Sequence, residues 1–435
     1  MLKSLIQRLI TIRENEVRAV ALATAYGFAI LFSYYILRPV RDEISTADRG
    51  NLQYLWTVVF LVMLVAVPAY SALVARRSRS VFIPFANRFF ASNLALFYAA
   101  IVFLPLGARP WIDRVFYVWT SVFALFVVTV FWGFIADLFR NEQGKRLFGF
   151  IAVGSSLGGI AGSGLTALIA ERVPVFLLLL IAIVPLEVAA RLARELHRES
   201  GRERTSLRRE EAQPIRGTAM SGIKVLARSP YLRRIAVFLA FMTFASTVLY
   251  FQQAELVGRA FEDRGVRTAF LAKIDLTVNV ITILTQGLFT AHIIRKIGLG
   301  LSLALIPAVV CLGFVSMGVY PLLAVLVAVQ VIYRSGRYAI TKPAREVLFT
   351  VVGREERYKS KAFIDAAVYR GGDLASGWIY AGLAALGLSV GAIALVAAPL
   401  AALWAGIGIL LGRQQEELAR ADEERSGAPE LASAV

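Results

Sequence analysis

Residues 142–164 read EQGKRLFGFIAVGSSLGGIAGSG, and residues 355–377 read EERYKSKAFIDAAVYRGGDLASG. A shift of 213 positions aligns the two stretches with seven identities in 23, among them a double glycine and a Ser-Gly pair in each copy. In each copy a charged segment leads into a run of small and apolar residues. A repeat of this kind indicates two halves of the same design, each containing an equivalent membrane helix.

The composition is that of a membrane protein. Of the 435 residues, 58% are apolar and only 18% are charged, and the mean hydropathy is +0.65. Soluble proteins carry roughly a quarter charged residues. The apolar runs are continuous, which excludes the alternating strands of porins. The predicted helical spans lie near 19–38, 52–75, 81–106, 115–137, 147–170, 173–190, 235–256, 269–293, 299–318, 321–340, 362–386 and 389–411.

The span count and the repeat predict an all-α membrane protein with twelve transmembrane helices in two six-helix bundles. This is the build of the major facilitator superfamily. The expected domains are the N-terminal bundle at 1–193, a cytoplasmic linker at 194–230, the C-terminal bundle at 231–413 and a cytoplasmic polar tail at 414–435. The small residues between Gly154 and Gly164 are expected to let the fifth span pack closely against another helix.

The basic residues indicate the orientation. With a cytoplasmic N-terminus, ten of the 47 Lys and Arg residues fall on the outer side and 37 on the inner side. Basic loops are retained in the cytoplasm, so this orientation, with both termini cytoplasmic, is favoured. The same asymmetry accounts for the net charge of +17 without a nucleic-acid partner.

Several classes of chemistry are excluded. One Cys and two His provide neither a disulfide framework nor a Cys/His metal cluster. No stretch matches G-x-x-x-x-G-K-[ST], and no nucleophile with an adjacent base is visible. We therefore expect no enzyme, no cofactor and no metal, and transport driven by exchange or by a gradient. The N-terminal stretch has no small-residue cleavage site, so no removable signal peptide is expected.

The first charged cluster closes the first span. Arg38, Arg41 and Asp42 stand at i, i+3 and i+4, and they share one face if the helix continues past Pro39. This spacing predicts a cationic lip at the outer mouth of a cavity, with Asp42 orienting Arg38. The alternative is an interfacial anchor whose arginines extend to the lipid headgroups.

The second cluster lies at the inner ends of the fourth and fifth spans. Asp137 and Glu142 need basic partners there, and Lys359 and Lys361 lie in the loop that the repeat makes equivalent. We expect the acids to pair with these lysines when the cytoplasmic side is closed. A purely topological role for the cluster is the alternative.

The third cluster follows the tenth span. Lys342, Arg345 and Glu346 repeat the spacing of the first cluster, and Asp365 lies downstream. These residues predict a second group of substrate-binding and gate-pairing side chains at the inner side.

Arg370 is the deepest charge. It lies nine residues after Lys361, about 13 Å further along a helix and close to the membrane midplane. A charge at that depth should face a cavity or a partner. Arg370 is therefore a candidate anchor for an anion, and Asp373 either neutralises it permanently or releases it when substrate arrives. Guanidinium groups suit phosphate and carboxylate because they offer paired donors.

Four motifs carry a family resemblance. They are Tyr-Ile-Leu-Arg-x-x-Arg-Asp at 35–42, Phe-Trp-Gly-Phe followed by Lys-Arg-x-Phe within 131–148, Arg-Tyr-Ala-x-x-Lys-Pro-x-Arg-Glu at 337–346 and Lys-x-Lys-Ala-x-Ile-Asp at 359–365. Together they resemble the ATP:ADP antiporter family, the major-facilitator-like nucleotide translocases of plastids and obligate intracellular bacteria. The resemblance implies nucleotide contacts for Arg41 and Arg345, where the family has Lys. It also places two acidic positions of the family on Gln143 and near Gln252.

These observations predict a secondary transporter of the bacterial inner (plasma) membrane. It would move an anionic, phosphate-bearing, nucleotide-like solute by alternating access, and it would act as a monomer within the lipid bilayer. One alternative is a proton-coupled transporter or exporter of a small non-nucleotide compound, with Glu255, Asp365 or Asp373 titrating. Another is a membrane scaffold or lipid-handling module without transport. The predicted substrate-binding residues are Arg38, Arg41, Lys342, Arg345 and Arg370, and the predicted gating residues are Asp42, Asp137, Glu142, Glu346, Lys359, Lys361, Asp365 and Asp373.

Overall fold

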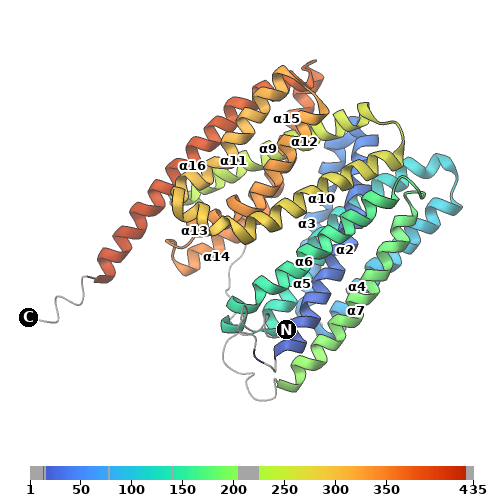
Figure 1. Ribbon diagram of the computed structural model, residues 1–435, viewed down its shortest axis with the longest axis horizontal. Coiled ribbons are helices and arrows are strands. Elements are labelled where there is room, and N and C mark those ends of the chain that lie inside the picture. Colours follow the sequence, from blue (N-terminus) through green and yellow to red (C-terminus); the bar gives the residue numbers. More distant parts are fainter. Residues whose placement is uncertain (1–12, 14–15, 77–78, 140, 204–224, 428–435) are drawn as a thin grey trace, which may run out of the picture. The chain divides into compact units, whose positions relative to one another are not determined.

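A computed structural model describes residues 13, 16–76, 79–139, 141–203 and 225–427, and no strand occurs in these ranges. The predicted all-α class is therefore confirmed (Figure 1). In chain order the elements are α2 (Val17–Ala47), η2 (Arg49–Asn51), α3 (Leu52–Arg76), α4 (Arg79–Phe103), η3 (Leu106–Ala108), α5 (Arg109–Leu138), α6 (Asn141–Ile169), α7 (Leu177–Glu203), α9 (Pro230–Ala260), α10 (Arg264–Leu288), α11 (Thr290–Val319), α12 (Leu323–Gly336), η5 (Arg337–Thr341), α13 (Lys342–Leu348), α14 (Arg354–Phe363), η6 (Ile364–Val368), α15 (Tyr369–Ala385) and α16 (Val390–Gly427).

Ten stretches in the described part of the chain are long and apolar enough to cross a membrane. The two other predicted spans, 173–190 and 362–386, are also helical, as α7 and as the succession α14, η6 and α15. They fall short for identifiable reasons. Glu187, Arg191 and Arg194 interrupt the apolar part of α7, and Arg370 and Asp373 lie in the first turns of α15. The count of twelve spans thus stays a prediction for these two segments.

The chain forms two compact units. One comprises Met1–Ala212 together with Gly258–Asn279, and the other comprises Gln213–Val257 together with Val280–Val435. Helix α10 begins in the first unit and ends in the second. Of the predicted linker, the N-terminal part is a continuation of α7 to Glu203, and residues 204–224 lie outside the described residues.

Helix α2 is the centre of the first unit, where it packs against α5, α6 and α7. Its closest neighbour is α6, whose Gly154, Gly158 and Gly162 lie against Thr24, Phe28 and Phe32. A Cβ atom on Gly158 would lie 2.2 Å from the carbonyl oxygen of Phe28. The close packing expected of the small residues in the fifth span is therefore confirmed.

Helix α7 packs against α4 as well as against α2, and Figure 1 shows α4 and α7 running side by side. Helix α3 packs against α5. The unit is thus a bundle whose apolar helices bury their small or apolar faces against one another.

In the second unit α11 packs against α16, and Gly300 faces Gly412 at their closest approach. Trp404 of α16 is fully buried against Phe238 of α9. Helix α11 bends at Gly298, whose φ of 80° is not helical. These contacts hold together the helices that carry the charged clusters of this unit.

Two π-helical segments interrupt the second unit. Segment η5 (Arg337–Thr341) joins α12 to α13, and η6 (Ile364–Val368) joins α14 to α15. A π-helical turn widens the helix locally and often marks a functional site. Both segments lie beside predicted site residues, because η5 directly precedes Lys342 and η6 contains Asp365.

The contact between α6 and α2 predicts a position-specific loss of stability. Gly158→Val places a branched side chain against the backbone of Phe28 and is expected to destabilise the protein by ~1–3 kcal/mol through overpacking. Gly149→Val on the same helix is the control, because nothing lies within 4 Å of a Cβ atom there. Thermal unfolding in detergent measures both variants, and equal unfolding temperatures would contradict the packing role.

Candidate functional site

Two five-residue motifs of the same type occur, one in each unit. Arg38-Pro39-Val40-Arg41-Asp42 lies near the C-terminal end of α2, and Lys342-Pro343-Ala344-Arg345-Glu346 begins α13. Helix α2 continues past Pro39, so Arg38, Arg41 and Asp42 share a face as the spacing predicts. In each motif the second basic residue is bound by the acid that follows it.

In the first motif Arg41 is the residue held by the acid. Its Nη2 and Nε atoms donate to Oδ1 of Asp42 at 2.7 and 3.1 Å. The guanidinium carbon lies 5.7 Å from the centre of the Tyr117 ring. Arg38 lies 3.7 Å from the other oxygen of Asp42 and 3.3 Å from Asp275. Asp42 therefore binds two arginines at once.

In the second motif Arg345 takes the equivalent place. Its Nη2 atom donates to Oε1 of Glu346 at 2.8 Å, and its Nη1 atom donates to the hydroxyl of Tyr369 at 2.9 Å. Asp365 accepts a longer bond of 3.4 Å. Lys361 binds the other oxygen of Glu346. Thus each unit holds an arginine beside a tyrosine, on a carboxylate that has a second basic partner.

Other predicted residues are placed differently. Lys342 is exposed, and in the described part of the structure no hydrogen bond or ion pair joins it to Arg345 or Glu346. Lys359 pairs with Glu355 of its own helix. Asp137 is half-buried near the end of α5, and the side chain of Glu142 lies outside the described residues. The proposed pairing of these acids with Lys359 and Lys361 stays a prediction.

Arg370 and Asp373 lie half-buried in the first turns of α15, directly after η6. Asp373 lies within electrostatic range of Arg370 and of a further arginine, Arg337 of η5. The side chain of Arg337 reaches Ser246 at 3.4 Å and lies over the ring of Tyr338 at 5.9 Å. Arg337 was not among the predicted site residues. Its position three residues after Arg334 and eight before Arg345, next to a predicted membrane span, is the signal that would have found it.

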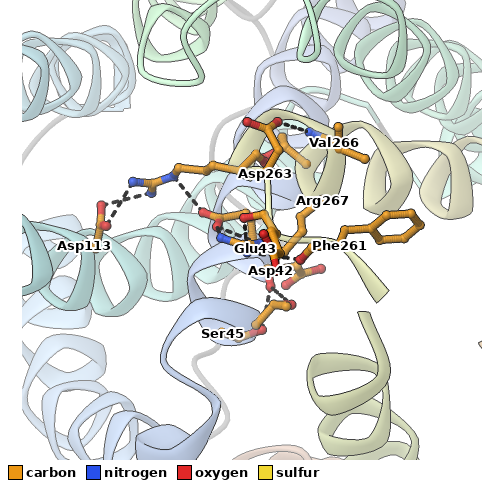
Figure 2. A network of polar contacts seen from close by, with 12 residues as sticks. Asp42, Glu43, Ser45, Asp113, Phe261, Asp263, Val266 and Arg267 are labelled. Atoms are coloured by element: carbon orange, nitrogen blue, oxygen red, sulfur yellow. Dashed lines mark hydrogen bonds and ion pairs between the residues drawn. The ribbon is translucent and has the colours of Figure 1, made fainter. Parts of the chain in front are cut away.

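The first unit contains a third ionic group that the sequence reasoning missed. The carboxylate of Glu43, of which only 1% is exposed, lies 2.8 Å from Nε of Arg264 and 2.7 Å from Nη2 of Arg267. Arg264 also binds Asp113 through two contacts of 3.0 Å. Figure 2 shows this network, in which Asp263 accepts a hydrogen bond from the backbone of Val266. The ion pairs hold the beginning of α10 to the C-terminal end of α2 and to the beginning of α5.

The two glutamines that replace acidic residues of the resembled family both act as donors. Gln143 donates to Oε1 of Glu16 at 2.9 Å, beside Arg146, which binds the same carboxylate at 2.8 Å. Gln252 is fully buried and donates to the carbonyl oxygen of Val390 at 3.1 Å. A carboxylate at either position would face an acceptor. Glutamine is therefore the residue that fits.

The carboxylate of Glu16 is kept ionised by its contacts with Gln143 and Arg146. Burial raises the pKa of Glu16, but hydrogen bonds from Gln143, from the Arg13 backbone and from Arg146 more than offset it and hold the pKa below its usual range. The group thus provides a stable carboxylate at the start of α2. Among the described residues, no cluster of His, Cys, Asp or Glu is suited to a metal ion.

Comparison with known proteins identifies relatives of this chain. The ADP,ATP carrier protein 1, chloroplastic, of Arabidopsis thaliana is 23% identical over 474 residues, which cover 94% of this chain and 75% of the carrier. The ADP,ATP carrier protein 1 of Chlamydia pneumoniae is 22% identical and covers 88% and 87%. The match with the Arabidopsis carrier protein 2, also 23% identical, covers 78% of this chain, and the chain spans only 64% of the length of that relative.

Solved structures show the fold. The POT family transporter PepTSo superimposes with a TM-score of 0.64 at 14% identity, over 92% of this chain and 98% of that one. A D-xylose-proton symporter gives 0.63 at 12% identity over 92% and 96%, and the nucleoside transporter NupG gives 0.59 at 12% over 93% and 99%. The fold is thus major-facilitator-like. A family model described as TLC ATP/ADP transporter matches residues 103–407, and the chain belongs to this family of membrane transporters rather than enzymes.

Proposed function

We propose that this protein is a secondary transporter that exchanges a nucleotide, or a closely related phosphate-bearing anion, by alternating access. Membership of the TLC ATP/ADP transporter family supports this function, as do relatives named as ADP,ATP carriers from chloroplasts and from a bacterium. We further propose a bacterial inner-membrane location, cytoplasmic termini, action as a monomer and no role for nucleic acid. The proposed domains remain two six-helix bundles at 1–193 and 231–413, the linker at 194–230 and the tail at 414–435.

The observation that carries the proposal is the pair of arginine motifs. A phosphate that binds Arg41 must compete with Asp42, and one that binds Arg345 must compete with Glu346. Each competing carboxylate already has a second basic partner, Arg38 for Asp42 and Lys361 for Glu346. Release of the arginine therefore leaves no unpaired carboxylate behind, which would otherwise be costly in a partly buried site.

The same arrangement suits the proposed substrate rather than a neutral one. Guanidinium groups bind phosphate oxygens through paired, charge-assisted hydrogen bonds. Arginine in place of the lysine of the resembled family keeps the charge and adds donors, so one group can bind a phosphate while it still contacts a tyrosine. Tyr117 and Tyr369 lie beside the two arginines and limit their movement.

Exchange in proteoliposomes tests the function. Vesicles preloaded with ADP should take up labelled ATP faster than vesicles that contain only buffer, because exchange needs an internal counter-substrate. Nucleoside mono-, di- and triphosphates, a sugar phosphate and inorganic phosphate, each used for preloading, define the substrate class. If no phosphate compound stimulates uptake, while an imposed pH gradient drives uptake of an uncharged compound, the proton-coupled alternative replaces the proposal.

Removal of either motif arginine should strongly reduce that exchange. Arg41→Gln and Arg345→Gln each remove a charged donor, which corresponds to a loss of about tenfold or more in the rate at limiting substrate. Arg295→Gln is the matched control, since Arg295 is exposed and bonds to the backbone of its own helix. Rates are normalised to inserted protein. Equal rates for all three variants would argue against the two arginines as substrate ligands.

A substitution of Arg370 tests the predicted anion anchor near the membrane midplane. Arg370→Ala should abolish exchange while the protein still inserts, because the variant lacks the anchor nearest the midplane and Asp373 keeps Arg337 as a basic neighbour. Transport kinetics in liposomes measure the effect, and detergent gel filtration checks folding. Unchanged kinetics would refute the assignment of Arg370 as an anion anchor.

The network around Glu43 should control exposure of the outer end of α2. Glu43→Gln removes the charge between Arg264 and Arg267, and disruption of a buried ion pair is generally destabilising by about 3–5 kcal/mol. Both variants carry Cys311→Ser and Ser45→Cys, which leaves a single Cys at a buried position of this network. That Cys should react several-fold faster with a membrane-impermeant maleimide in the Glu43→Gln variant than in the protein with Glu43.

Asp263→Asn is the control for this experiment. It neutralises a carboxylate of the same network whose one hydrogen bond among the described residues is accepted from the backbone of Val266. The labelling rate of the Cys at Ser45 should stay unchanged in the control. A similar rate in the Glu43→Gln variant would show that the ion pairs do not hold α10 to α2.

A further inference from the structure

Three charged side chains lie together on the outer surface of the first unit, away from the arginine motifs. Arg88 of α4 binds Glu187 of α7 through two hydrogen bonds of 2.7 and 2.8 Å. Arg191, one turn further along α7, binds the same carboxylate at 3.0 Å. One carboxylate thus holds two guanidinium groups, one from each of two neighbouring helices.

The surface around these charges is apolar. Phe85 and Phe89 flank Arg88 on α4, and Val184 and Val188 flank Glu187 on α7, and all four are exposed. The charged side chains are exposed as well, at 47% for Arg88, 31% for Glu187 and 74% for Arg191. Such a surface on a membrane helix faces lipid, not the interior of the bundle.

Arg88, Glu187 and Arg191 lie within reach of the boundary between lipid headgroups and acyl chains. Arg88 lies seven residues after Val81, where the apolar run of the sequence begins, which corresponds to about 10 Å along the helix. Arginine side chains bridge such a distance by extending towards the headgroups. Arg191 lies near the middle of α7, where the apolar run ends and charged residues follow towards the C-terminus, so the group belongs to the leaflet on that side.

The charges of the group do not cancel. Two guanidiniums share one carboxylate, so one positive charge is in excess. Among the described residues, Nη1 of Arg88 and both terminal nitrogens of Arg191 have no hydrogen-bond partner. The next acid along α7, Glu195, is bound by Arg18 and Arg198 and not by Arg191. The group therefore offers donors and net positive charge to an anion.

We propose that Arg88 and Arg191 bind the phosphate of an anionic phospholipid, whose acyl chains lie along the exposed side chains of α4 and α7. Basic pockets between membrane helices are suited to acidic headgroups. Glu187 keeps the two guanidiniums adjacent. A second copy of the chain fits less well, because a symmetric face-to-face contact would bring the two positive groups together.

Native mass spectrometry of the purified full chain tests the proposal, with phosphatidylglycerol or phosphatidylcholine added at equal concentration. The wild type should retain phosphatidylglycerol in preference to phosphatidylcholine. The double variant Arg88→Gln/Arg191→Gln should lose phosphatidylglycerol retention by roughly 30-fold, since each basic residue near an anionic lipid contributes about fivefold. Retention of phosphatidylcholine should not change.

The matched control is the double variant Arg295→Gln/Arg413→Gln, which removes the same charge from exposed positions elsewhere. It should retain phosphatidylglycerol as the wild type does. Glu187→Gln keeps an acceptor for Arg88 and raises the excess charge from one to two, so it should increase retention. A merely structural ion pair predicts the opposite, a loss of retention equal to that of the arginine variant.

Four results would overturn the proposal. The first is equal retention of both lipids by the wild type. The second and third are a loss of phosphatidylglycerol retention in the control that equals the loss in the arginine variant, and any loss of it in Glu187→Gln. The fourth is full displacement of phosphatidylglycerol by inorganic phosphate, which would indicate a site for free phosphate. Dimer ions that disappear in the arginine variant, with lipid retention unchanged, would assign the surface to a second copy instead.

Discussion

A charge inside an apolar helical bundle is tolerated only beside a partner, and the structure depends on this constraint throughout. Water is excluded there, so an unpaired guanidinium or carboxylate would cost several kcal/mol. Glu43 between Arg264 and Arg267, and Arg38 beside Asp275, meet the constraint by joining segments far apart in the chain. The ionic groups of the first unit therefore hold together helices that are far apart in the chain.

The constraint also shapes the two arginine motifs. In each, the carboxylate has more than one basic partner, so one partner is free to change while the others remain. If the carboxylate had only one basic partner, the two groups would not separate easily, because separation would leave an unpaired buried charge. The π-helical segments beside the second motif place this exchangeable group on a locally widened helix. In the transport cycle proposed above, this arrangement lets the arginine bind the substrate and return to its carboxylate afterwards.

The sequence predicted what depends on local pattern. Continuous apolar runs predicted the helices, and the spacing of Arg38, Arg41 and Asp42 predicted their shared face. Pairings over long sequence distances were missed. Arg267 binds Glu43 across 224 residues, and Gln143 binds Glu16 across 127. Helical periodicity contains no information on which distant charge faces which, so Arg264 and Arg267 read only as loop charges.

The surroundings of Gln143 show that matching single sequence positions does not reveal where the charges lie in space. Matched along the sequence, the loop before the fifth span has lost a carboxylate of the resembled family. In space, Glu16 places a carboxylate within hydrogen-bond distance of both Gln143 and Arg146. An acid at 143 would repel Glu16, whereas an amide binds it. The negative charge at this point therefore comes from Glu16, at the start of α2, and not from residue 143 of α6.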